Sequence, residues 1–513
     1  MAELLRVLAA DAPDGAALID EAGETSRRSL DERVNRLVHA FRARGVAEGS
    51  TLALMARNRR EWFEIQLAAL HAGVTLVPVN WHWRAKEIGH VLDDSGAALL
   101  IVEDEFAGVA AQALAGRTIP AVVIGKAEAP AAEPYESVVA SGSPEEPAGQ
   151  SLALPMFYTS GTTGVPKGVR PALAPAPPAV LAGAAEEVTG RLGIPAGGVT
   201  LLAGPIHHQA QWSFSVLPLL LGSTVVMRSS YDTGEILRLI DAHRVTNVNL
   251  VPIQFVRMLR LPEAERAAFD GSSLVVAVHG AAPCPVHIKQ AMLDWWGPRF
   301  TEFYGGTEGG LVSSITAREW LTKPGSVGRP AEHVDVRILD EDGAPVPAGR
   351  PGRIWTRDRR GLDFRYHNDP GKTAAAHRDG LMTLGDVGHL DEDGYLYLSD
   401  RDIDMIISGG VNIYPAEIEG VLLAHAAVAD AAVFGIPNDE YGEEVKALVQ
   451  PVPGVAATDA LAAELIAHCR EELAGYKAPR SLDFVRELPR TPSGKLPKRS
   501  LRAPYWRDRA GRV

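Results

Sequence analysis

The sequence predicts a mixed α/β protein with a large N-terminal body of mostly parallel sheets covered by helices, a β-hairpin-rich subdomain, and a small, mobile α+β domain at the C-terminus. Three observations predict this fold. In the first part of the chain, apolar runs of Val, Ile and Leu alternate with helical periodicity, an order typical of parallel sheets. Asp-Gly dipeptides then stand between alternating apolar residues, as in β-hairpins. Mixed helix and strand patterns return near the C-terminus.

The strand, helix, strand order is clearest within residues 224–255, which contain TVVMRSS, GEILRLIDAHRV and TNVNLVPIQF. The hairpin pattern begins near Val334, in VRILDEDGAPV and GHLDEDGYLYLSD. After it, we expect a helix over PAEIEGVLLAHA, a strand over VADAAVFGI and a helix near ATDALAAELIAHCREELAG. We place a boundary near Arg401, which divides the chain into a large domain of residues 1–401 and a small C-terminal lid domain of residues 402–513.

Composition excludes several classes of protein. The chain has 513 residues, 46% hydrophobic and 22% charged, which argues against a disordered, collagen-like or coiled-coil protein. A formal charge of −13 gives no overall attraction to nucleic acid or to anionic membranes. The two cysteines, Cys284 and Cys469, are too few for a disulfide framework and fit a reducing compartment. We therefore expect a cytoplasmic protein with no nucleic-acid or integral-membrane partner, and we leave a homo-oligomer open.

A loop rich in glycine and hydroxyl groups carries the strongest chemical signal. The segment FYTSGTTGVPKGVR, residues 157–170, follows an apolar stretch that is typical of a strand. Glycines let backbone N–H groups turn inward, hydroxyls add donors and a lysine adds a cation, so this loop can wrap a polyphosphate. A glycine-rich surface turn is the alternative on composition alone. The loop is not a Walker loop, because Gly168 instead of Ser or Thr follows Lys167.

Five sequence blocks in order resemble the adenylate-forming superfamily, which includes acyl-CoA synthetases, luciferase and the adenylation domains of peptide synthetases. They are YTSGTTGVPKGV, HGAAP at 279–283, YGGTEGG at 304–310, residues 383–419, and LPRTPSGK at 488–495. The pattern is most similar to acyl-CoA synthetases. The resemblance implies that ATP, Mg²⁺ and coenzyme A bind to the protein, the last as a co-substrate.

The resemblance also implies roles for individual residues. Catalytic roles fall to Lys495 for the adenylation step, Glu308 as the Mg²⁺ ligand, Thr307 at the α-phosphate, and His208. The implied nucleotide and coenzyme A contacts are Thr159, Ser160, Gly161, Thr162, Thr163, Gly164, Lys167, Gly280, Ala281, Ala282, Pro283, Tyr304, Asp386, Arg401, Ser408, Gly409 and Gly410. Within this set Tyr304 contacts adenine, Asp386 and Arg401 hold the ribose, and residues 408–410 line the pantetheine path. These roles suit the chemistry of the side chains, since magnesium prefers carboxylate oxygen and an ammonium offsets phosphate charge.

The acid pocket is predicted from a second group of residues. His207, Gln209, Gln211, Trp212, His279 and Gly305 are the expected substrate contacts. Unpaired buried amides cost roughly 1–3 kcal/mol each, so this polar and aromatic lining favours an aromatic or polyfunctional acid over a long-chain fatty acid. His279 replaces the small residue common in the family, and a hydrogen-bonded core histidine is the alternative interpretation.

We therefore predict an AMP-forming acid–thiol ligase. It activates a small-molecule carboxylic acid as an acyl adenylate, releases pyrophosphate and transfers the acyl group to coenzyme A. Two departures from the family pattern, Ile403 at the hinge and Val411 in GGVN, bear on the transfer step. The alternatives are transfer to a carrier protein, an amine or another nucleophile, a kinase-like phosphotransferase, and a catalytically silent binding protein.

Overall fold

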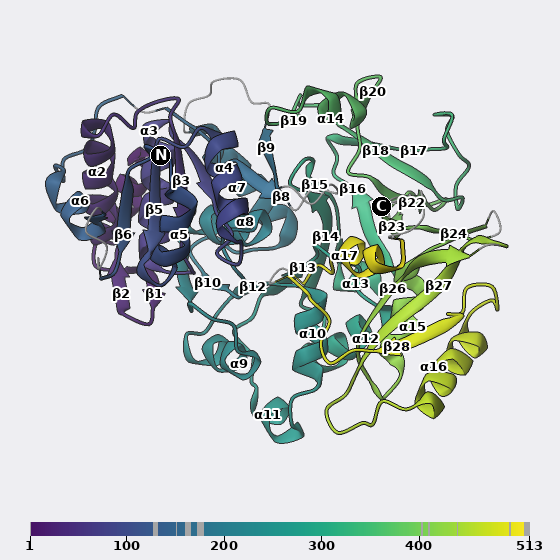
Figure 1. Cartoon of the computed structure of the whole chain (residues 1–513). Coiled ribbons are helices and arrows are strands. Elements are labelled where there is room, and N and C mark those ends of the chain that lie inside the picture. Colours follow the sequence, from purple (N-terminus) through teal and green to yellow (C-terminus); the bar gives the residue numbers. More distant parts are fainter. Residues whose placement is uncertain are drawn as a thin grey trace.

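A computed structural model of the chain describes residues 2–126, 132–149, 151–159, 166–171, 179–401, 404–408, 411–438, 440–491 and 494–506. Within these ranges the fold class predicted from the sequence is confirmed (Figure 1). A large body contains two sheets with helices on their faces, and a smaller sheet with its own helices follows at the C-terminus.

The N-terminal lobe is built on a five-stranded parallel sheet in the order β4-β3-β5-β6-β7. Every residue of β3 is buried, as expected for a strand covered on both faces by helices. The elements of this lobe are α1 (Ala2–Asp11), β1 (Ala16–Asp20), β2 (Gly23–Ser26), α2 (Arg27–Ala43), β3 (Thr51–Met55), α3 (Arg60–Ala72), β4 (Thr75–Pro78), α4 (Ala85–Ser95), β5 (Leu99–Glu103), η1 (Asp104–Phe106), α5 (Ala107–Leu114), β6 (Ala121–Ile124), β7 (Glu133–Pro134) and α6 (Tyr135–Ser141).

The central sheet begins with strands that the sequence pattern identifies. β1, β11, β10, β12, β13 and β14 are neighbours in that order and all pair in parallel. The elements here are α7 (Ala179–Leu192), β10 (Val199–Leu202), α8 (Gln209–Leu220), β11 (Thr224–Met227), α9 (Thr233–Ala242), β12 (Asn247–Leu250), α10 (Pro252–Leu259), α11 (Glu263–Ala268), β13 (Val276–His279), α12 (Val286–Trp296) and β14 (Phe300–Gly306). One face packs against α9, α10 and α12, and the other against α7 and α8.

At one edge of the central sheet β2 pairs antiparallel with β1, and on the β14 side the change to antiparallel pairing comes earlier than the predicted change near Val334. β14 already pairs antiparallel with β15, and the sheet continues through β16, β23, β22, β18, β21 and β20. The reason is the close return of the chain after Tyr304: a Cβ on Gly305 would stand 1.9 Å from the Gly310 carbonyl oxygen. The elements are β15 (Gly310–Thr316), α13 (Ala317–Trp320), β16 (Ser326–Pro330), β17 (Val334–Leu339), β18 (Gly352–Asp358), β20 (His377–Arg378), β21 (Leu381–Met382), β22 (Asp386–Leu390) and β23 (Leu396–Arg401).

A small three-stranded sheet of order β19-β9-β8 holds the two sides of the predicted phosphate loop. It consists of β8 (Phe157–Thr159), β9 (Lys167–Pro171) and β19 (Phe364–Tyr366), and α14 (Pro370–Ala375) packs against β19. Thr159 is paired directly with Lys167. The two strands that flank the predicted loop are therefore an antiparallel pair, with Thr159 opposite Lys167.

The C-terminal residues from 404 onward form a separate sheet of order β25-β24-β27-β26, with β28 beside β27. α15 and α16 pack on one face of this sheet and α17 on the other. The elements are β24 (Ile406–Ser408), β25 (Val411–Ile413), α15 (Pro415–Ala424), β26 (Val428–Asn438), β27 (Gly442–Pro451), α16 (Asp459–Glu472), β28 (Ser481–Phe484), α17 (Lys498–Arg502) and η2 (Ala503–Trp506). The predicted boundary follows the last residue of β23 and stays a prediction, as does the mobility of the small domain.

Among the helices that the structure describes, none is both long enough and apolar enough to cross a membrane.

Candidate active site

The predicted nucleotide residues gather where β13 and β14 end. β13 ends at His279, and a Cβ on Gly280 would stand 2.6 Å from the Phe303 carbonyl oxygen, so only glycine fits this crossing of two strands. Ala281 has a φ of +65°, a left-handed conformation that costs energy for a residue with a side chain. Residues 280–283 thus form a tightly constrained turn at the carboxyl edge of the parallel sheet, where ligands collect in open α/β sheets.

Tyr304 connects this turn to the predicted ribose residues. Its ring is 6% exposed, and its hydroxyl donates a hydrogen bond to Oδ2 of Asp386 at 2.8 Å. Asp386 is paired with Arg401 across β22 and β23. Three residues chosen from two sequence blocks therefore converge, and the order of the hairpin strands places the two ribose candidates opposite each other.

Glu308 lies in the turn between β14 and β15, beside Thr307. Its Oε1 accepts a hydrogen bond from the Tyr366 hydroxyl at 3.1 Å. Among the described residues, no three His, Cys, Asp or Glu side chains gather as a metal cluster. A single half-buried carboxylate fits magnesium in a phosphate site, since this ion takes one or two carboxylates together with phosphate oxygens. Glu308 would hold the ion, which when bound neutralises phosphate charge.

His207 and His208 precede α8 and are held as neutral imidazoles. Burial, with a smaller effect from the neighbouring Lys495 ammonium, lowers the pKa of His208 to about 3. Burial also holds the pKa of His207 well below its usual value. In the described part of the chain, neither nitrogen of His207 nor Nε2 of His208 has a hydrogen-bond partner. Buried polar atoms without partners are costly, so these imidazoles are suited to meeting a polar ligand.

Aromatic side chains surround the two histidines. The rings of His207 and His208 lie 4.4 Å apart between centroids, and Trp81 stands edge-on to His207 at 6.4 Å. Trp81 follows β4 and was not singled out from the sequence. Its position just after a parallel strand, in NWHWR, is the signal that could have identified it.

The other predicted acid contacts divide into two groups. Gln209 and Trp212 line a cavity of about 40 Å³ together with Thr307, so one small space joins the acid candidates to the phosphate candidate. Gln211 instead donates from Nε2 to the Asn249 carbonyl oxygen at 3.3 Å and is buried against the sheet.

His279 lies on the face of the sheet that α10 and α12 cover. Its ring packs edge-on against Phe255 at 5.0 Å, and its Nε2 is 3.8 Å from Oε2 of Glu302, which is paired with Lys289 at 2.5 Å. Burial, followed by the Lys289 charge, holds the pKa of His279 well below its usual value. Its part in binding the acid stays a prediction.

The yellow chain that follows β28 runs toward α10 and β13 of the large domain before it reaches α17 (Figure 1). Lys495 belongs to this segment. Gly494 has a φ of +80°, and a Cβ there would stand 3.0 Å from Cγ2 of Ile253 in α10. Arg490 binds Asp430 at 2.5 and 2.7 Å and donates to the Gly494 carbonyl oxygen at 2.8 Å, which fixes the turn. The Lys495 charge lowers the pKa of His208, so the two residues lie within electrostatic range of each other.

A second contact joins the two domains. Arg260, which follows α10, donates to the main-chain carbonyl oxygens of Val428 and Ala429 at the start of β26, the latter at 2.6 Å. Ser408 ends β24 and pairs with Gly442, and Val411 is 44% exposed at the start of β25. The predicted residues Ser160, Gly161, Thr162, Thr163, Gly164, Gly409 and Gly410, with the hinge residue Ile403, lie outside the described residues, and so does the side chain of Arg401.

Two family profiles match this chain. A family profile described as "AMP-binding enzyme" matches residues 5–361, and one described as "AMP-binding enzyme C-terminal domain" matches residues 417–495. The chain belongs to the AMP-binding enzyme family. The resemblance inferred from the five blocks is therefore confirmed, whereas the roles of individual residues stay predictions.

Three similar proteins differ in the group that accepts the acid. A feruloyl-CoA synthase from Amycolatopsis sp is 36% identical over 92% of this chain and 92% of its own. A fatty acid–[acyl-carrier-protein] ligase, ScoC, from Streptomyces coeruleorubidus is 31% identical over 98% and 95%. The solved structure of the amide bond synthetase McbA from Marinactinospora thermotolerans has a TM-score of 0.83 at 27% identity, covering 98% of this chain and 99% of that one.

Proposed function

We propose that the protein is an AMP-forming acyl-CoA synthetase, an acid–thiol ligase that couples ATP to thioester formation on an aromatic or polyfunctional carboxylic acid. The observation that carries this proposal is the convergence of Tyr304, Asp386 and Glu308 at the carboxyl edge of the parallel sheet, with the Lys495 charge near enough to His208 to lower its pKa. A carboxylate bound there has a cation and neutral imidazoles around it.

The residues of the chain act by binding and positioning. Tyr304 and the turn at 280–283 hold adenine, while Asp386 and Arg401 hold the ribose, so the α-phosphate is directed toward Thr307. Lys495 offsets the negative charge shared by the carboxylate and the α-phosphate, a gain that grows as the new bond forms. His208 stays neutral and can donate a hydrogen bond without adding charge.

Coenzyme A is the proposed acceptor. The relative with 36% identity is named for a coenzyme A thioester, which supports a thiol. The similarity to an amide bond synthetase favours an amine as the second candidate. The proposal includes a mobile small domain and a cytoplasmic location, and it leaves a homo-oligomer open.

The test is analysis of the products formed from ATP with a panel of aliphatic, aryl and steroid-like acids, with and without coenzyme A. AMP and pyrophosphate that depend on the acid support the ligase, and an acyl-CoA product identifies the acceptor. An amide that forms only with an added amine would replace coenzyme A as acceptor. ADP would indicate a phosphotransferase, and no turnover with any acid would favour a binding protein.

A further inference from the structure

Two lysines stand side by side at the hairpin that carries the predicted phosphate loop. Lys167 begins β9, and its Nζ lies 3.5 Å from Oδ2 of Asp369. Lys372 lies in α14, and its Nζ lies 3.9 Å from the centroid of the Tyr366 ring. Because β9 pairs with β19, and α14 packs on β19, a continuous piece of backbone structure brings the two ammonium groups together.

Asp369 and Glu308 offset the charge of the two lysines only in part. Burial and then the adjacent Lys167 charge lower the pKa of Lys372 to about 8, although Glu308 and Asp369 act in the opposite direction. The Asp369 side chain is 38% exposed, and its distance to Lys167 is longer than a good charge-assisted hydrogen bond. Two like charges in a half-buried position are costly, and an anion with several charged oxygens would remove that cost.

Tyr366 ties this pair to the predicted magnesium ligand. The ring that lies under Lys372 carries the hydroxyl that donates to Oε1 of Glu308 at 3.1 Å. One aromatic side chain therefore contacts both the ammonium and the carboxylate, and Lys372 lies close enough for Glu308 to affect its charge. Lys167, Lys372 and Glu308 surround one place, which is next to Thr307 and so next to the α-phosphate position.

We propose that Lys372 acts with Lys167 to bind the β- and γ-phosphates of ATP, and that the pair stabilises the pyrophosphate as it leaves. This inference rests on the proposed function. In the step concerned, a carboxylate oxygen forms a bond to the α-phosphorus, and the bond from that phosphorus to the oxygen bridging to the β-phosphate breaks. The bridging oxygen keeps the electron pair, so negative charge grows on the pyrophosphate, where two ammonium groups can stabilise it.

The direct test is the binding of magnesium pyrophosphate, measured by titration calorimetry on the full chain. We expect Lys372→Met to weaken binding by at least about tenfold and Lys372→Arg, which keeps the charge, to weaken it by no more than about threefold. The matched control is Lys126→Met, which removes an exposed lysine at the end of β6 and should bind as the wild type does. AMP lacks the two phosphates, so its affinity should be the same in all four proteins.

Several outcomes would overturn the inference. Equal pyrophosphate affinity in Lys372→Met and the wild type would remove Lys372 from the subsite, and so would a wild type that does not bind pyrophosphate. Equal weakening of AMP and pyrophosphate, or a lowered melting temperature that Lys372→Arg shares, would mean that the substitution damages the fold. The proposed function is judged separately by acid-dependent AMP formation in the wild type, because the binding assay needs no turnover.

Discussion

Two charged regions of this protein are built in opposite ways. In the N-terminal lobe, a cavity of about 760 Å³ is lined by Asp20, Glu21, Glu24, Arg33, Arg59, Arg60, Glu61, Glu64, Glu103 and Glu136, with smaller polar residues between them. At the hairpin of β8 and β9, by contrast, two lysines, Lys167 and Lys372, are neighbours. None of the residues around the cavity belongs to the five sequence blocks.

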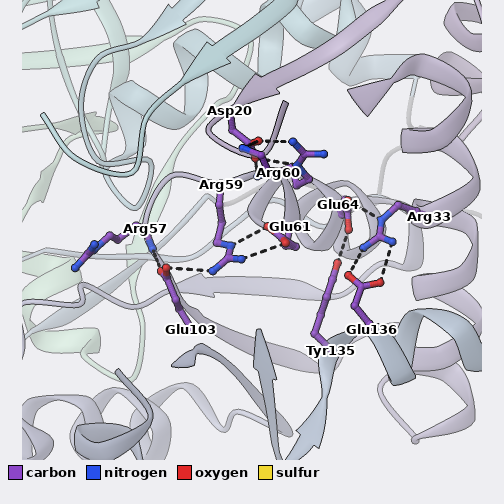
Figure 2. Close-up of polar contacts among 11 residues, drawn as sticks. Asp20, Arg33, Arg57, Arg59, Arg60, Glu61, Glu64, Glu103, Tyr135 and Glu136 are labelled. Carbon is purple, nitrogen blue, oxygen red and sulfur yellow. Dashed lines mark hydrogen bonds and ion pairs between the residues drawn. The ribbon is translucent and has the colours of Figure 1, made fainter. Parts of the chain in front are cut away.

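Every arginine around the N-terminal cavity is paired with a carboxylate (Figure 2), although seven carboxylates line the cavity against three arginines. Arg33 binds Glu64 at 2.7 Å and Glu136 at 2.7 and 3.0 Å, and the Tyr135 hydroxyl donates to the other oxygen of Glu64 at 2.7 Å. Arg60 binds Asp20, and Arg59 binds Glu61 at 2.7 Å and Glu103 at 3.1 Å. Each arginine labelled in this network thus has a carboxylate partner. The Arg57 side chain pairs with Glu105, and its main-chain N–H donates to Glu103 at 2.8 Å.

This contrast indicates that cavity size and charge density are poor guides to a ligand site. A charge that is paired inside the protein stabilises one conformation and offers little to a ligand. The lysine pair has the opposite property, because its energy improves when a ligand arrives. The same holds for the imidazoles near α8, three of whose ring nitrogens have no hydrogen-bond partner among the described residues. Substitutions in each region test this contrast.

The largest effect is expected from Arg33→Met. Glu64 is fully buried, so removing its guanidinium partner should lower the free energy of unfolding by about 3–5 kcal/mol near pH 8, measured by urea denaturation. Burial raises the pKa of Glu64, and loss of Arg33 raises it further, so the mutant's deficit should shrink as the pH falls from 8 toward 5 and Glu64 takes up a proton.

Two controls belong with this variant. Arg28→Met breaks an exposed pair with Asp14 and should cost no more than about 1 kcal/mol. Adding Glu64→Gln to Arg33→Met should restore part of the lost stability by removing the unpaired charge. If Arg33→Met unfolds like Arg28→Met, or if it weakens pyrophosphate binding, the contrast between the two regions fails.

Next in size is Lys495→Ala. Adenylate formation should fall by on the order of 10²-fold or more, because the charge shared by the carboxylate and the α-phosphate loses its cation. A supplied acyl adenylate should still react with the acceptor in single-turnover measurements. Lys477→Ala, which removes another lysine of the same domain, is the control. Equal loss of both half-reactions in Lys495→Ala would indicate damage to the fold or to the acceptor site.

A smaller effect is expected in the chemistry of Lys372 itself. With a pKa of about 8, about half of its side chains are neutral amines at pH 8, whereas an ordinary lysine with a pKa of about 10.4 is almost fully charged. Lys372 should therefore react with an acylating reagent tens of times faster than Lys126, as followed by peptide mass spectrometry. Magnesium pyrophosphate should protect Lys372 alone. Equal acylation rates for Lys372 and Lys126 would show that the surroundings of Lys372 do not lower its pKa.

The smallest effect concerns the acid. Aromatic or polyfunctional acids should exceed palmitate by at least about tenfold in kcat/KM, since each unmatched buried polar group costs a hydrocarbon roughly 1 kcal/mol or more. Gln209→Leu should reduce this preference severalfold, because Gln209 lines the small cavity beside Thr307. A wild type that prefers palmitate would assign Gln209 and Trp212 to packing.

Much of the fold follows from local patterns. The parallel strands, the hairpin of β22 and β23 and the elements α15, β26 and α16 were predicted from periodicity and from Asp-Gly dipeptides. The early start of antiparallel pairing was not predicted. It depends on the tight return of the chain between Gly305 and the Gly310 carbonyl oxygen, within the block YGGTEGG, whose residue types indicate a ligand contact and not a turn between strands.

The candidate site follows a similar division. The motifs identified Tyr304, Glu308, Asp386 and Lys495 because their residue types and spacing are distinctive. Tyr366 and Lys372 carry no such signal, since FRYHNDPGKT reads as a strand end followed by an ordinary helix cap. Their importance arises from the pairing of β19 with β9, which connects residues about two hundred positions apart.

The hydrogen bonds from Arg260 to the carbonyl oxygens of Val428 and Ala429 have a kinetic meaning. Their acceptors are main-chain atoms, so this contact between the domains tolerates any side chain at 428 and 429 that preserves the strand. The only side chain on which these two hydrogen bonds depend is that of Arg260. If the small domain turns between the two half-reactions, these hydrogen bonds break and re-form once per catalytic cycle. Loss of Arg260 would then shorten the time that the two domains spend in the adenylating arrangement.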